Sequence, residues 1–483
     1  MNNLDAFFNP TNIAIVGASA NPEKAGYTIL SNLVSIGYPK KVFPIHASEK
    51  EILGFPCYPK LAAVPDRIEM VVLVMPSKFI YEVMEDLEQR MREKGDVRVI
   101  VCAAADYAET KKEEGIRRQA CLMETARRCG IRVMGPNCIG VIDNVNRVDT
   151  TFVETLLPKE SRGKRGGISF ISQSGSVAAS LLMIGASQPA PISLNKFVSI
   201  GNMADVDFID LLNYFEEDPD TKVIGIYMEG YADGARLIKN MARIARKKPI
   251  VVFKVGRSEI GAEAANSHTG SLAGADQVYS AAFRQYGVIQ VDTIEELMDV
   301  MQAFNSCVLP QDERTFVLTQ AGGPGIYCTD CIEAGGRLKM PVVSQDTKEA
   351  LRSCLLSMAS VCSPEGYADI TASATVAHHV DSLRIVLEDS SVSNVIFITV
   401  LPTFLPREEL ANGLVQLLKG EGWMQKKPVY VCVMAGNYAL PACRILEANG
   451  IRTYDTPRSC VRTAERLTEY ASFLRRKGDS PIE

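Results

Sequence analysis

The sequence lacks the features that mark several large classes of protein. Its 483 residues carry 52 Lys and Arg against 57 Asp and Glu, which gives a formal net charge of −5. Proteins that bind nucleic acid usually have a strong basic excess, so we expect neither a nucleic-acid partner nor attraction to an anionic membrane surface. No apolar run reaches the roughly 18 residues of a membrane span, and the N-terminus lacks the basic-then-apolar pattern of a signal peptide. The sequence therefore predicts a cytoplasmic protein that does not enter membranes.

Metal and disulfide chemistry also find little support. Without a secretion signal, the 13 cysteines are expected to be reduced thiols. Cys328 and Cys331 form the one C-x-x-C pattern, and a second pair at zinc-ligand spacing is missing, so we predict a helix-packing role for them and no metal ligands. Histidine is scarce, with four in the chain. Two of them, His378 and His379, lie in a helix-like stretch and are expected at the surface or in packing.

The sequence does contain a repeated alternation of short apolar runs and amphipathic helical stretches. Continuous apolar runs such as 12–19, 69–76 and 97–104 suit strands that are buried on both faces of a parallel sheet. Helical stretches such as 78–95 lie between them. Similar apolar runs return at 167–172, 196–201, 223–229, 249–256, 315–320, 395–401 and 428–434. Strands that alternate with helices predict α/β folds with right-handed crossovers.

Two polar stretches interrupt this alternation. Residues 144–166 are polar, basic and end in glycines, and residues 306–314 are short and include a proline. Boundaries at these stretches agree with about 150 residues per domain, and they predict three α/β domains: 1–145, 146–305 and 306–483. Ligands of open parallel sheets bind beyond the carboxyl ends of the strands, so the turns that directly follow strands are the candidate sites.

The first such turn runs from Gly17 into a helix. Glycine lets a backbone approach a ligand closely, and a helix N-terminus offers N–H groups to a phosphate. The pattern is not G-x-G-x-x-G, because only Gly17 and Gly26 are present, so a nucleotide-like ligand is favoured without pointing to NAD. A tight turn without a ligand stays open. Pro44 and Pro76 end other strands and Asn137 follows the last one, so these residues would lie along the same sheet edge.

Two further helix starts are predicted anion sites. Residues 172–175 (Ser172, Gln173, Ser174 and Gly175) carry a strand straight into a helix, and a serine N-cap with free N–H groups makes a compact anion site. A nucleophile elbow would need G-x-S-x-G, which is absent because Ser and Gln occupy the two positions before Ser174. In the third domain a similar start contains three glycines that leave no side chain in the way of an anion: Gly322, Gly323 and Gly325.

His268 is the histidine most suited to chemistry. It is expected in a loop of small residues, 264–274, after the apolar run at 249–256. An accessible imidazole there could be a nucleophile or a general base, although a structural histidine is the alternative. Beside anion sites it could accept a phosphoryl group if a carboxylate held the N–H of its other nitrogen. Glu229 stands at a strand end and is the candidate carboxylate, unless it is only an acid at the start of a helix.

These residues and motifs resemble the α subunit of NDP-forming acyl-CoA synthetases of the ADP-forming acetyl-CoA synthetase type, which are relatives of succinyl-CoA synthetase. The resemblance covers almost the whole chain. It rests on IAIVGAS, GPNCIG, ISQSGSVAA, FVSIGNMADVDFIDLL, KVGRSEIGAEAANSHTGSLAGAD, AAFRQYGVIQVDTIEELMD and AGGPGI. It implies a Rossmann-like CoA-binding domain followed by two flavodoxin-like ligase domains. The chain departs from the family's usual turns at 44–48, 104–109 and 363–369, so those turns do not carry the resemblance.

The resemblance also implies roles for single residues. His268 would be phosphorylated, with Glu229 as its supporting carboxylate, and the helices that start near Ser172 and Gly322 would point their N-termini at the phosphohistidine. The residues near the CoA phosphates or pantetheine, or along the same cleft, would be Gly17, Ser19, Lys24, Pro44, Pro76 and Asn137.

The implied reaction converts acyl-CoA, ADP and phosphate into a carboxylic acid, CoA and ATP, through an acyl phosphate and a phosphohistidine. Nothing in the chain reads as the ATP-grasp domain that binds nucleotide and Mg²⁺ in this family, so a separate β subunit is implied, in an αβ or α2β2 assembly. A non-catalytic CoA-binding or regulatory protein, similar to modules of protein acetyltransferases, is the main alternative. Retention of His268, Glu229 and both glycine turns argues against it. An NAD-dependent dehydrogenase is disfavoured by the missing second glycine.

Overall fold

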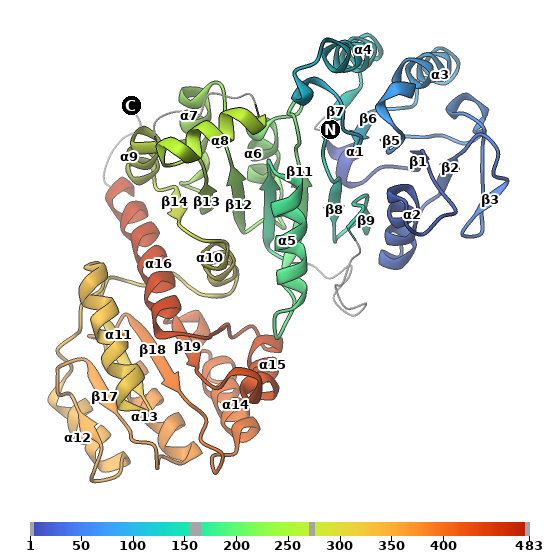
Figure 1. Cartoon of the computed structure of the whole chain (residues 1–483). Helices are drawn as coiled ribbons and strands as arrows, with labels where there is room; N and C mark the ends of the chain where they lie inside the picture. Colours follow the sequence, from blue (N-terminus) through green and yellow to red (C-terminus); the bar gives the residue numbers. More distant parts are fainter. Residues whose placement is uncertain (1–3, 154–165, 270–275, 479–483) are drawn as a thin grey trace. The chain divides into compact units, whose positions relative to one another are not determined.

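The computed structural model describes residues 4–153, 166–269 and 276–478 of the chain (Figure 1). Backbone contacts divide the chain into an N-terminal unit, residues 1–290, and a C-terminal unit, residues 291–483. The first predicted domain and residues 146–290 of the second lie in the N-terminal unit, whereas residues 291–305 belong to the C-terminal unit. The domain boundaries at 145 and 305 stay predictions. No helix in the described part of the chain is both long and apolar enough to cross a membrane.

The first sheet has the strand order β2-β1-β5-β6-β7, and all its pairings are parallel. The strands are β1 (Ile13–Val16), β2 (Val42–Ile45), β5 (Met70–Leu73), β6 (Val99–Cys102) and β7 (Arg132–Met134). Every residue of the first four strands is buried, which explains their unbroken apolar runs. Figure 1 shows α2 (Ala25–Ile36) on one face and α3 (Ile80–Glu93) and α4 (Glu113–Cys129) on the other.

The second sheet has seven strands in the order β14-β13-β12-β10-β11-β8-β9. The parallel core is formed by β10 (Ile168–Ser172), β11 (Leu194–Ser199), β12 (Val223–Met228) and β13 (Ile250–Lys254). The remaining strands are β14 (Ile289–Val291) and the antiparallel β8 (Val141–Asp143) and β9 (Val148–Asp149). Residues 141–149 thus extend the second sheet. The helices are α5 (Gly175–Ala186), α6 (Phe208–Glu217), α7 (Gly234–Ile244), α8 (Glu259–Thr269) and α9 (Asp276–Tyr286).

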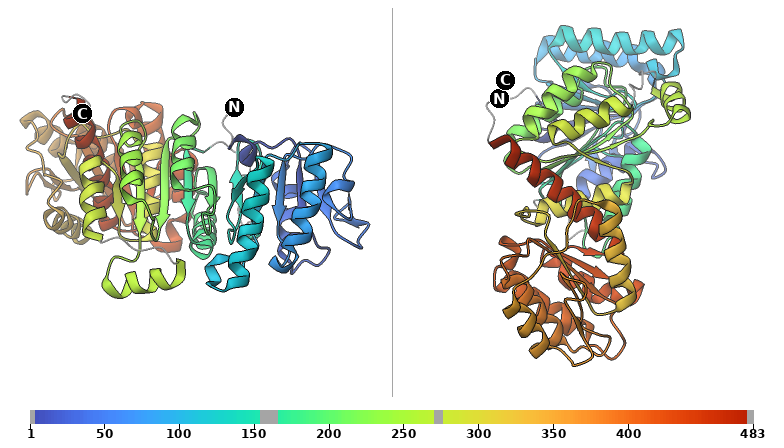
Figure 2. Two further views of the ribbon diagram at one scale, coloured as in Figure 1. Left: turned by 90° about the horizontal axis from the view of Figure 1, so that it is seen from above. Right: turned by 90° about the vertical axis from the view of Figure 1, so that its left-hand side faces the viewer.

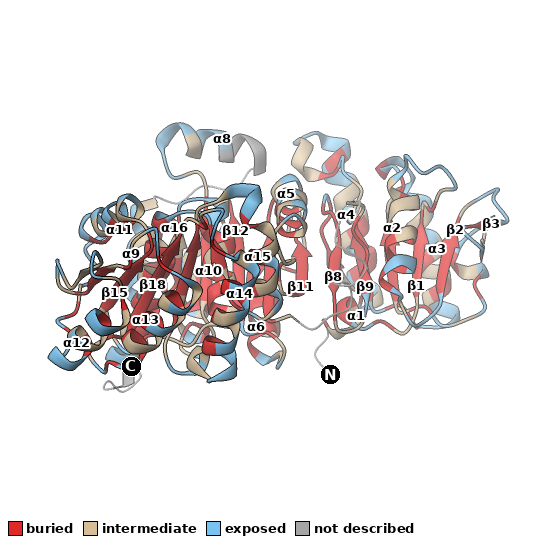
Figure 3. Cartoon of the chain, turned by 90° about the horizontal axis from the view of Figure 1, so that it is seen from below, coloured by how far each residue is buried: buried red, intermediate tan, exposed pale blue. Residues whose placement is uncertain are grey.

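The third sheet has the order β16-β17-β15-β18-β19-β20, with β16 (Ser360–Val361) antiparallel and the other pairings parallel. The parallel strands are β15 (Thr315–Thr319), β17 (Tyr367–Asp369), β18 (Asn394–Thr399), β19 (Val429–Val433) and β20 (Thr453–Tyr454). Their helices are α10 (Ile294–Ser306), α11 (Gly322–Gly335), α12 (Gln345–Cys354), α13 (Val376–Glu388), α14 (Arg407–Val415), α15 (Leu440–Ala448) and α16 (Pro457–Gly478). Figure 2 shows helices on both faces of the sheets, and Figure 3 shows the strands as the buried layer.

One strand order is used three times. In space the main strands lie in the orders β2-β1-β5-β6-β7, β11-β10-β12-β13-β14 and β17-β15-β18-β19-β20. When the five strands of each sheet are numbered along the chain, all three orders read 2-1-3-4-5. In this doubly wound order the chain reverses its direction of travel between strands 1 and 3, and ligands bind at that switch point. The three switch points are therefore β1/β5, β10/β12 and β15/β18.

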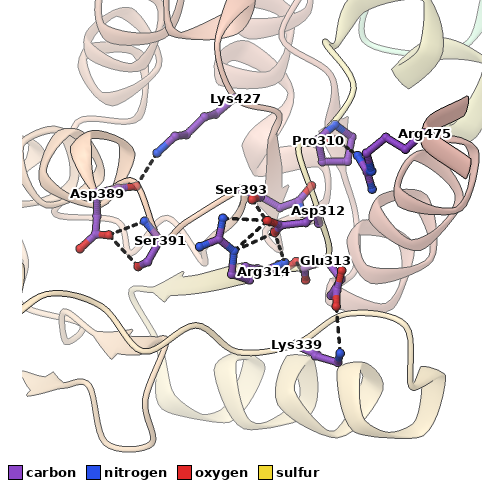
Figure 4. Close-up of polar contacts among 12 residues, drawn as sticks. Pro310, Asp312, Glu313, Arg314, Lys339, Asp389, Ser391, Ser393, Lys427 and Arg475 are labelled. Atoms are coloured by element: carbon purple, nitrogen blue, oxygen red, sulfur yellow. Dashed lines mark hydrogen bonds and ion pairs between the residues drawn. The ribbon is translucent and has the colours of Figure 1, made fainter. Parts of the chain in front are cut away.

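The amino-terminal edge of the third sheet is held by ion pairs (Figure 4). The guanidinium of Arg314 donates to both carboxylate oxygens of Asp312 at 2.9 Å, and the Ser393 hydroxyl adds a third hydrogen bond at 2.6 Å. Burial alone would raise the pKa of Asp312, but these hydrogen bonds lower it to about 2. Nearby, Lys427 donates to the backbone oxygens of Leu387 and Asp389. These groups lie at the edge away from the switch-point turns.

Candidate functional site

At the β1/β5 switch point two glycines meet. Gly17 has φ +95°, and a methyl group there would lie 2.7 Å from the backbone nitrogen of Met75. A methyl group on Gly26 would lie 2.1 Å from the carbonyl oxygen of Gly17. The first turn of α2 therefore rests directly on the end of β1, although the two glycines stand nine positions apart. Lys24 is the N-cap and offers no side-chain cap, so the first N–H groups of α2 remain available to an anion.

The other residues predicted to contact CoA are placed unevenly. Pro76 follows β5 and is exposed, and Asn137 follows β7, exposed, with φ +59°. Ser19 is half-buried and accepts a hydrogen bond from the backbone nitrogen of Asn21, whereas Lys24 is exposed. Pro44 is buried inside β2 rather than after it. A cavity of about 590 Å³ opens beside the carboxyl ends of β1 and β2, lined by Val16, Ile45, Lys60 and polar residues of α3.

The β10/β12 switch point is closed by a ladder of side-chain hydrogen bonds. The Ser172 hydroxyl donates to the carbonyl of Ser174 at 2.7 Å, and the Ser174 hydroxyl accepts from the backbone nitrogen of Val177 as the N-cap of α5. The backbone nitrogen of Gln173 donates to the carbonyl of Tyr227. The turn from β10 into α5 is therefore rigid, and it presents the first turn of α5 at the carboxyl edge of the sheet.

Gln173 also fixes the candidate carboxylate. Its Oε1 accepts from the backbone nitrogens of Glu229 at 2.8 Å and Gly230 at 3.2 Å. Glu229 is buried, with 5% of its surface exposed. Burial first, and then the charge and hydrogen bond of Glu229, raise the pKa of Tyr227. The predicted phosphate-binding Gln173 thus spends its oxygen on holding the turn at Glu229, and only its amide N–H groups remain for a ligand.

His268 lies in the last turn of α8, and the expectation of a loop is wrong. The alanines and glutamates of 259–265 favour a helix, so small residues there do not indicate a loop. The side chain of His268 lies outside the described residues, as do residues 270–275. Its contact with Glu229 or with α5 stays a prediction.

The first two sheets are joined at their carboxyl edges. The backbone nitrogens of Asn202 and Ala204 donate to the carbonyls of Pro136 and Gly135 at 2.9 and 3.1 Å. A methyl group on Gly201 would lie 2.2 Å from the Pro136 carbonyl oxygen. Asn202 was not predicted as a site residue, because a turn after β11 carries no sign of a partner in another sheet.

This junction brings predicted CoA and phosphate residues close together. The amide of Asn137 lies 3.4 Å from the side-chain oxygen of Asn202. Two residues further on, Ile139 packs against the start of α5, since a methyl group on Gly175 would lie 3.0 Å from its Cγ2. The segment 135–139 therefore connects the carboxyl edge of the first sheet to the anion site of the second. A thioester held by the first sheet and a phosphate held by α5 could meet along it.

The β15/β18 switch point repeats the arrangement of the second sheet. The Thr319 hydroxyl donates to the carbonyl of Ala321 at 2.8 Å, as that of Ser172 does to Ser174. The Oε1 of Gln320 accepts from the Thr399 hydroxyl at 2.7 Å and from the backbone nitrogen of Val400 at 3.3 Å. Gln320 was not predicted as a site residue, although it stands two positions before Gly322, as Gln173 stands two positions before Gly175.

The three predicted phosphate-binding glycines of α11 differ in their surroundings. A methyl group on Gly322 would lie 3.1 Å from the Asp369 carboxylate, and one on Gly323 would meet nothing within 4 Å. One on Gly325 would lie 2.5 Å from the Tyr367 hydroxyl. Gly323 therefore faces open space, and Gly325 allows α11 to pack closely on β17.

The two cysteines of the C-x-x-C pattern lie within α11 and not in the turns after the strands. Cys328 is buried and Cys331 is half-buried, both within α11. In the part of the chain that the structure describes, no group of three or more His, Cys, Asp or Glu side chains is arranged to hold a metal ion.

Comparison with known proteins decides the family. Residues 11–144 match the family described as CoA binding domain, and residues 165–304 match the family described as succinyl-CoA ligase like flavodoxin domain. The chain is 37% identical to acetate–CoA ligase [ADP-forming] II subunit alpha of Pyrococcus furiosus, over 97% of this chain and 98% of that protein. The chain belongs to the family of ADP-forming acetate–CoA ligase alpha subunits. The resemblance inferred from the motifs and the α/β fold class, with a CoA-binding domain and flavodoxin-like ligase domains, are confirmed.

Two further members of this family extend the comparison. A structure of the dinucleotide forming acetyl-coenzyme A synthetase 1 of Ca. Korarchaeum cryptofilum, in complex with phosphate and ADP, matches with a TM-score of 0.88 and 32% identity, over 100% of both chains. Acetate–CoA ligase [ADP-forming] I of Archaeoglobus fulgidus is 33% identical over 97% of this chain but only 64% of its own length. The present chain therefore spans about two thirds of the length of that relative.

Proposed function

We propose that this chain is the α subunit of an ADP-forming acyl-CoA synthetase, which converts acyl-CoA, ADP and phosphate into a carboxylic acid, CoA and ATP. The observation that carries the proposal is the buried Glu229, whose backbone nitrogen donates to Gln173, the residue directly before the N-cap of α5. Helix N-termini stabilise phosphate, and a buried carboxylate can orient an imidazole for attack on it. Acetate is the acid in the names of relatives.

The proposed steps use the edges of the first two sheets. CoA lies along the first sheet, near Gly17, Ser19, Lys24, Pro44, Pro76 and Asn137. Phosphate, held at α5 by residues 172–175, attacks the thioester carbonyl to give an acyl phosphate, and CoA leaves as the thiol. One ring nitrogen of His268 then attacks the phosphorus of the acyl phosphate, so that the phosphoryl group moves to His268 and the carboxylate leaves. Glu229 meanwhile accepts a hydrogen bond from the N–H of the other ring nitrogen. The glycines at the start of α11 form a second place for the phosphoryl group.

We further propose that a separate β subunit completes the enzyme. The relatives named as α subunits imply a partner, and the Archaeoglobus fulgidus relative has about a third of its length beyond the part that this chain matches. A β subunit with an ATP-grasp domain would supply the site for ADP, ATP and Mg²⁺, in an αβ or α2β2 assembly. The three predicted domains, 1–145, 146–305 and 306–483, would then be the CoA-binding domain, the ligase domain that carries His268, and a second ligase domain.

The test is phosphorylation of the full chain by acetyl-CoA and labelled phosphate, with the β subunit present. We expect label on the wild-type chain, none on His268→Asn, and at least about a 100-fold slower reaction for Glu229→Gln, in the range of lost acid–base groups. His378→Asn changes a half-buried histidine of α13; it is the matched control and should keep full labelling. Label that persists in His268→Asn, or CoA binding without any labelling from a panel of acyl-CoA thioesters, would overturn the proposal in favour of a non-catalytic CoA-binding protein.

A further inference from the structure

Tyr227 lies beside the candidate carboxylate, at the carboxyl edge of the second sheet. It is in β12 and Glu229 directly follows that strand, and side chains two positions apart along a strand lie on one face of the sheet. In the neighbouring strands the register partners of Tyr227 are Ser172 of β10 and Phe253 of β13. The rings of Tyr227 and Phe253 are 5.8 Å apart, edge to face. Tyr227 is therefore packed between the strand that leads into α5 and β13, with 6% of its surface exposed.

A hydrogen bond joins the side chains of Tyr227 and Glu229. Burial first, and then the charge of Glu229 and this hydrogen bond, raise the pKa of Tyr227. The hydroxyl therefore keeps its proton at neutral pH, so it is the donor and the Glu229 carboxylate is the acceptor. A buried carboxylate needs donors to its oxygens, because burial without them is costly. Tyr227 supplies such a donor.

Glu229 is thus held through both its backbone and its side chain. The Oε1 of Gln173 accepts from the backbone nitrogens of Glu229 at 2.8 Å and Gly230 at 3.2 Å, which fixes the turn. The Tyr227 hydroxyl binds the carboxylate and so limits the rotation of the side chain. A carboxylate has two oxygens with about four lone-pair sites, so it can accept further hydrogen bonds. The bond from Tyr227 therefore leaves acceptor positions for the N–H of an imidazole and fixes where they lie.

We propose that Tyr227 is a positioning residue for phosphoryl transfer. Its hydroxyl orients the Glu229 carboxylate, which in turn holds the imidazole of His268 in the orientation and tautomer that attack on phosphorus requires. The inference rests on the function proposed above and adds a residue that acts through Glu229 without touching the phosphoryl group. A carboxylate that is already oriented leaves less to be ordered when the reaction occurs. Loss of the hydroxyl should therefore slow the chemistry and leave the binding of CoA unchanged.

The first experiment measures single-turnover labelling of the full chain by acetyl-CoA and labelled phosphate, with the β subunit present. Tyr227→Phe keeps the ring beside Phe253 and removes only the hydroxyl. We expect it to be labelled at least about tenfold more slowly than the wild type, with CoA affinity within about twofold. Tyr38→Phe is the matched control, because it loses a hydrogen bond of 3.0 Å to the Pro10 carbonyl at the amino-terminal edge of the first sheet. Its rate should stay within about twofold of the wild type. Equal rates in Tyr227→Phe and the wild type would overturn the proposal.

A double-mutant cycle distinguishes a positioning role from a structural one. In a Glu229→Ala background, Tyr227→Phe should change the labelling rate by less than about twofold, because the hydroxyl acts through the carboxylate. A second loss as large as that in the wild-type background would mean that Tyr227 only supports the fold. The same four proteins, unfolded by denaturant, should show a coupling of at least about fivefold in the equilibrium constant of unfolding. Additive stabilities would show that the two side chains form no hydrogen bond in solution, and the proposal would be wrong.

Failure of this inference can be told from failure of the proposed function. If the wild type is labelled on His268 and Tyr227→Phe is labelled at the same rate, the function proposed above stands and the role of Tyr227 is wrong. If the wild type is never labelled, the function itself is wrong, and so is the positioning role of Tyr227, whatever coupling the stabilities show.

Discussion

His379 shows how burial changes a single residue. It lies in α13 with no exposed surface, and its Nδ1 stands 2.7 Å from the carbonyl of Thr375. Burial, only partly offset by this hydrogen bond, lowers its pKa from 6.5 to about 4. Its neighbour His378 is half-buried and completes a capping box with Thr375. The sequence predicted surface or packing positions for the two histidines; His379 is a packing residue, and His378 is half-buried at the start of the helix.

The pKa of His379 predicts acid sensitivity of the C-terminal unit. Because the folded-state pKa is lower than the unfolded one, the unfolded chain binds more protons between pH 6.5 and 4. The stability from neutral His379 is fully present above pH 6.5 and is lost as the pH falls towards 4, by about 3 kcal/mol. Denaturation followed by the fluorescence of Trp423, the single tryptophan, should show this loss in the wild type and in His378→Asn. His379→Asn should lack it, and an unchanged pH dependence there would assign the effect to another group.

At the residue scale, the positions of the candidate turns could be predicted from the sequence, but the contacts of the single side chains in them could not. The turns after strands were identified from glycines and hydroxyl residues, and they do lie at the switch points. Gln173 was predicted to bind phosphate, but its oxygen holds the turn at Glu229. The contacts of Gln320 with Thr399 and Val400 were not predicted, because these partners lie far away in the sequence.

At the scale of elements, each apolar run given above overlaps a strand whose ends lie within three residues of those of the run, but the short strands such as β8, β9 and β14 and the helix α8 were not predicted. A run of apolar residues buried on both faces can only be a central strand or a buried helix, and its length of four to six residues decides for the strand. The segment 259–269 is different. Its described residues, 259–264, are exposed or half-buried, so no apolar stripe marks α8 as a helix. The loop was predicted from the small residues of this segment, and that prediction failed because alanine favours a helix.

Because α2 contacts β1 closely, we expect that one added methyl group at Gly26 lowers both the stability of the fold and the affinity for CoA. Gly26→Ala would place a carbon 2.1 Å from the Gly17 carbonyl oxygen, so α2 must shift away from the strand, at a cost of about 1–3 kcal/mol. The shift moves the first turn of α2 away from the predicted CoA site, and CoA affinity should fall at least about tenfold. Val34→Ala, on an exposed position of the same helix, should change stability by less than about 0.5 kcal/mol. Calorimetric CoA titration and chemical denaturation measure both effects, and unaltered CoA binding in Gly26→Ala would contradict the placement.

At the scale of the whole molecule, the sequence predicted three α/β domains but not their kinship or their junction. The three sheets share the order 2-1-3-4-5, yet the turns that follow their first strands share little beyond glycine, and only the second and third contain a glutamine. Residues 141–149 form the antiparallel strands β8 and β9 of the second sheet. A short polar turn joins these strands, and no long apolar run in the sequence predicted them. The pairing of residues 202–206 with 133–136 is likewise set by tertiary contacts alone.

The junction of the first two sheets predicts a local loss of protection. Arg132 donates to Asp205 at 2.9 Å and to Asp210 at 2.7 Å. Arg132→Met leaves both carboxylates without this partner, so the amides of Asn202 and Ala204 should exchange hydrogen at least about tenfold faster. Amides of β15 and β18 in the C-terminal unit should be unaffected. Arg117→Met removes an exposed ion pair of α4 and should leave the junction unchanged. Equal exchange in Arg132→Met and wild type would show that backbone pairing alone maintains the junction.

The close approach of Gly201 to Pro136 has a thermodynamic consequence. A methyl group on Gly201 would lie only 2.2 Å from the Pro136 carbonyl oxygen, so the turn after β7 and the turn after β11 are in direct backbone contact. A ligand that stabilises one arrangement of the first turn must also bias the second. Two ligands on either side of this junction therefore bind with a coupling free energy, and that coupling is reciprocal. Whatever factor CoA adds to the affinity for an anion at α5, the anion adds to the affinity for CoA.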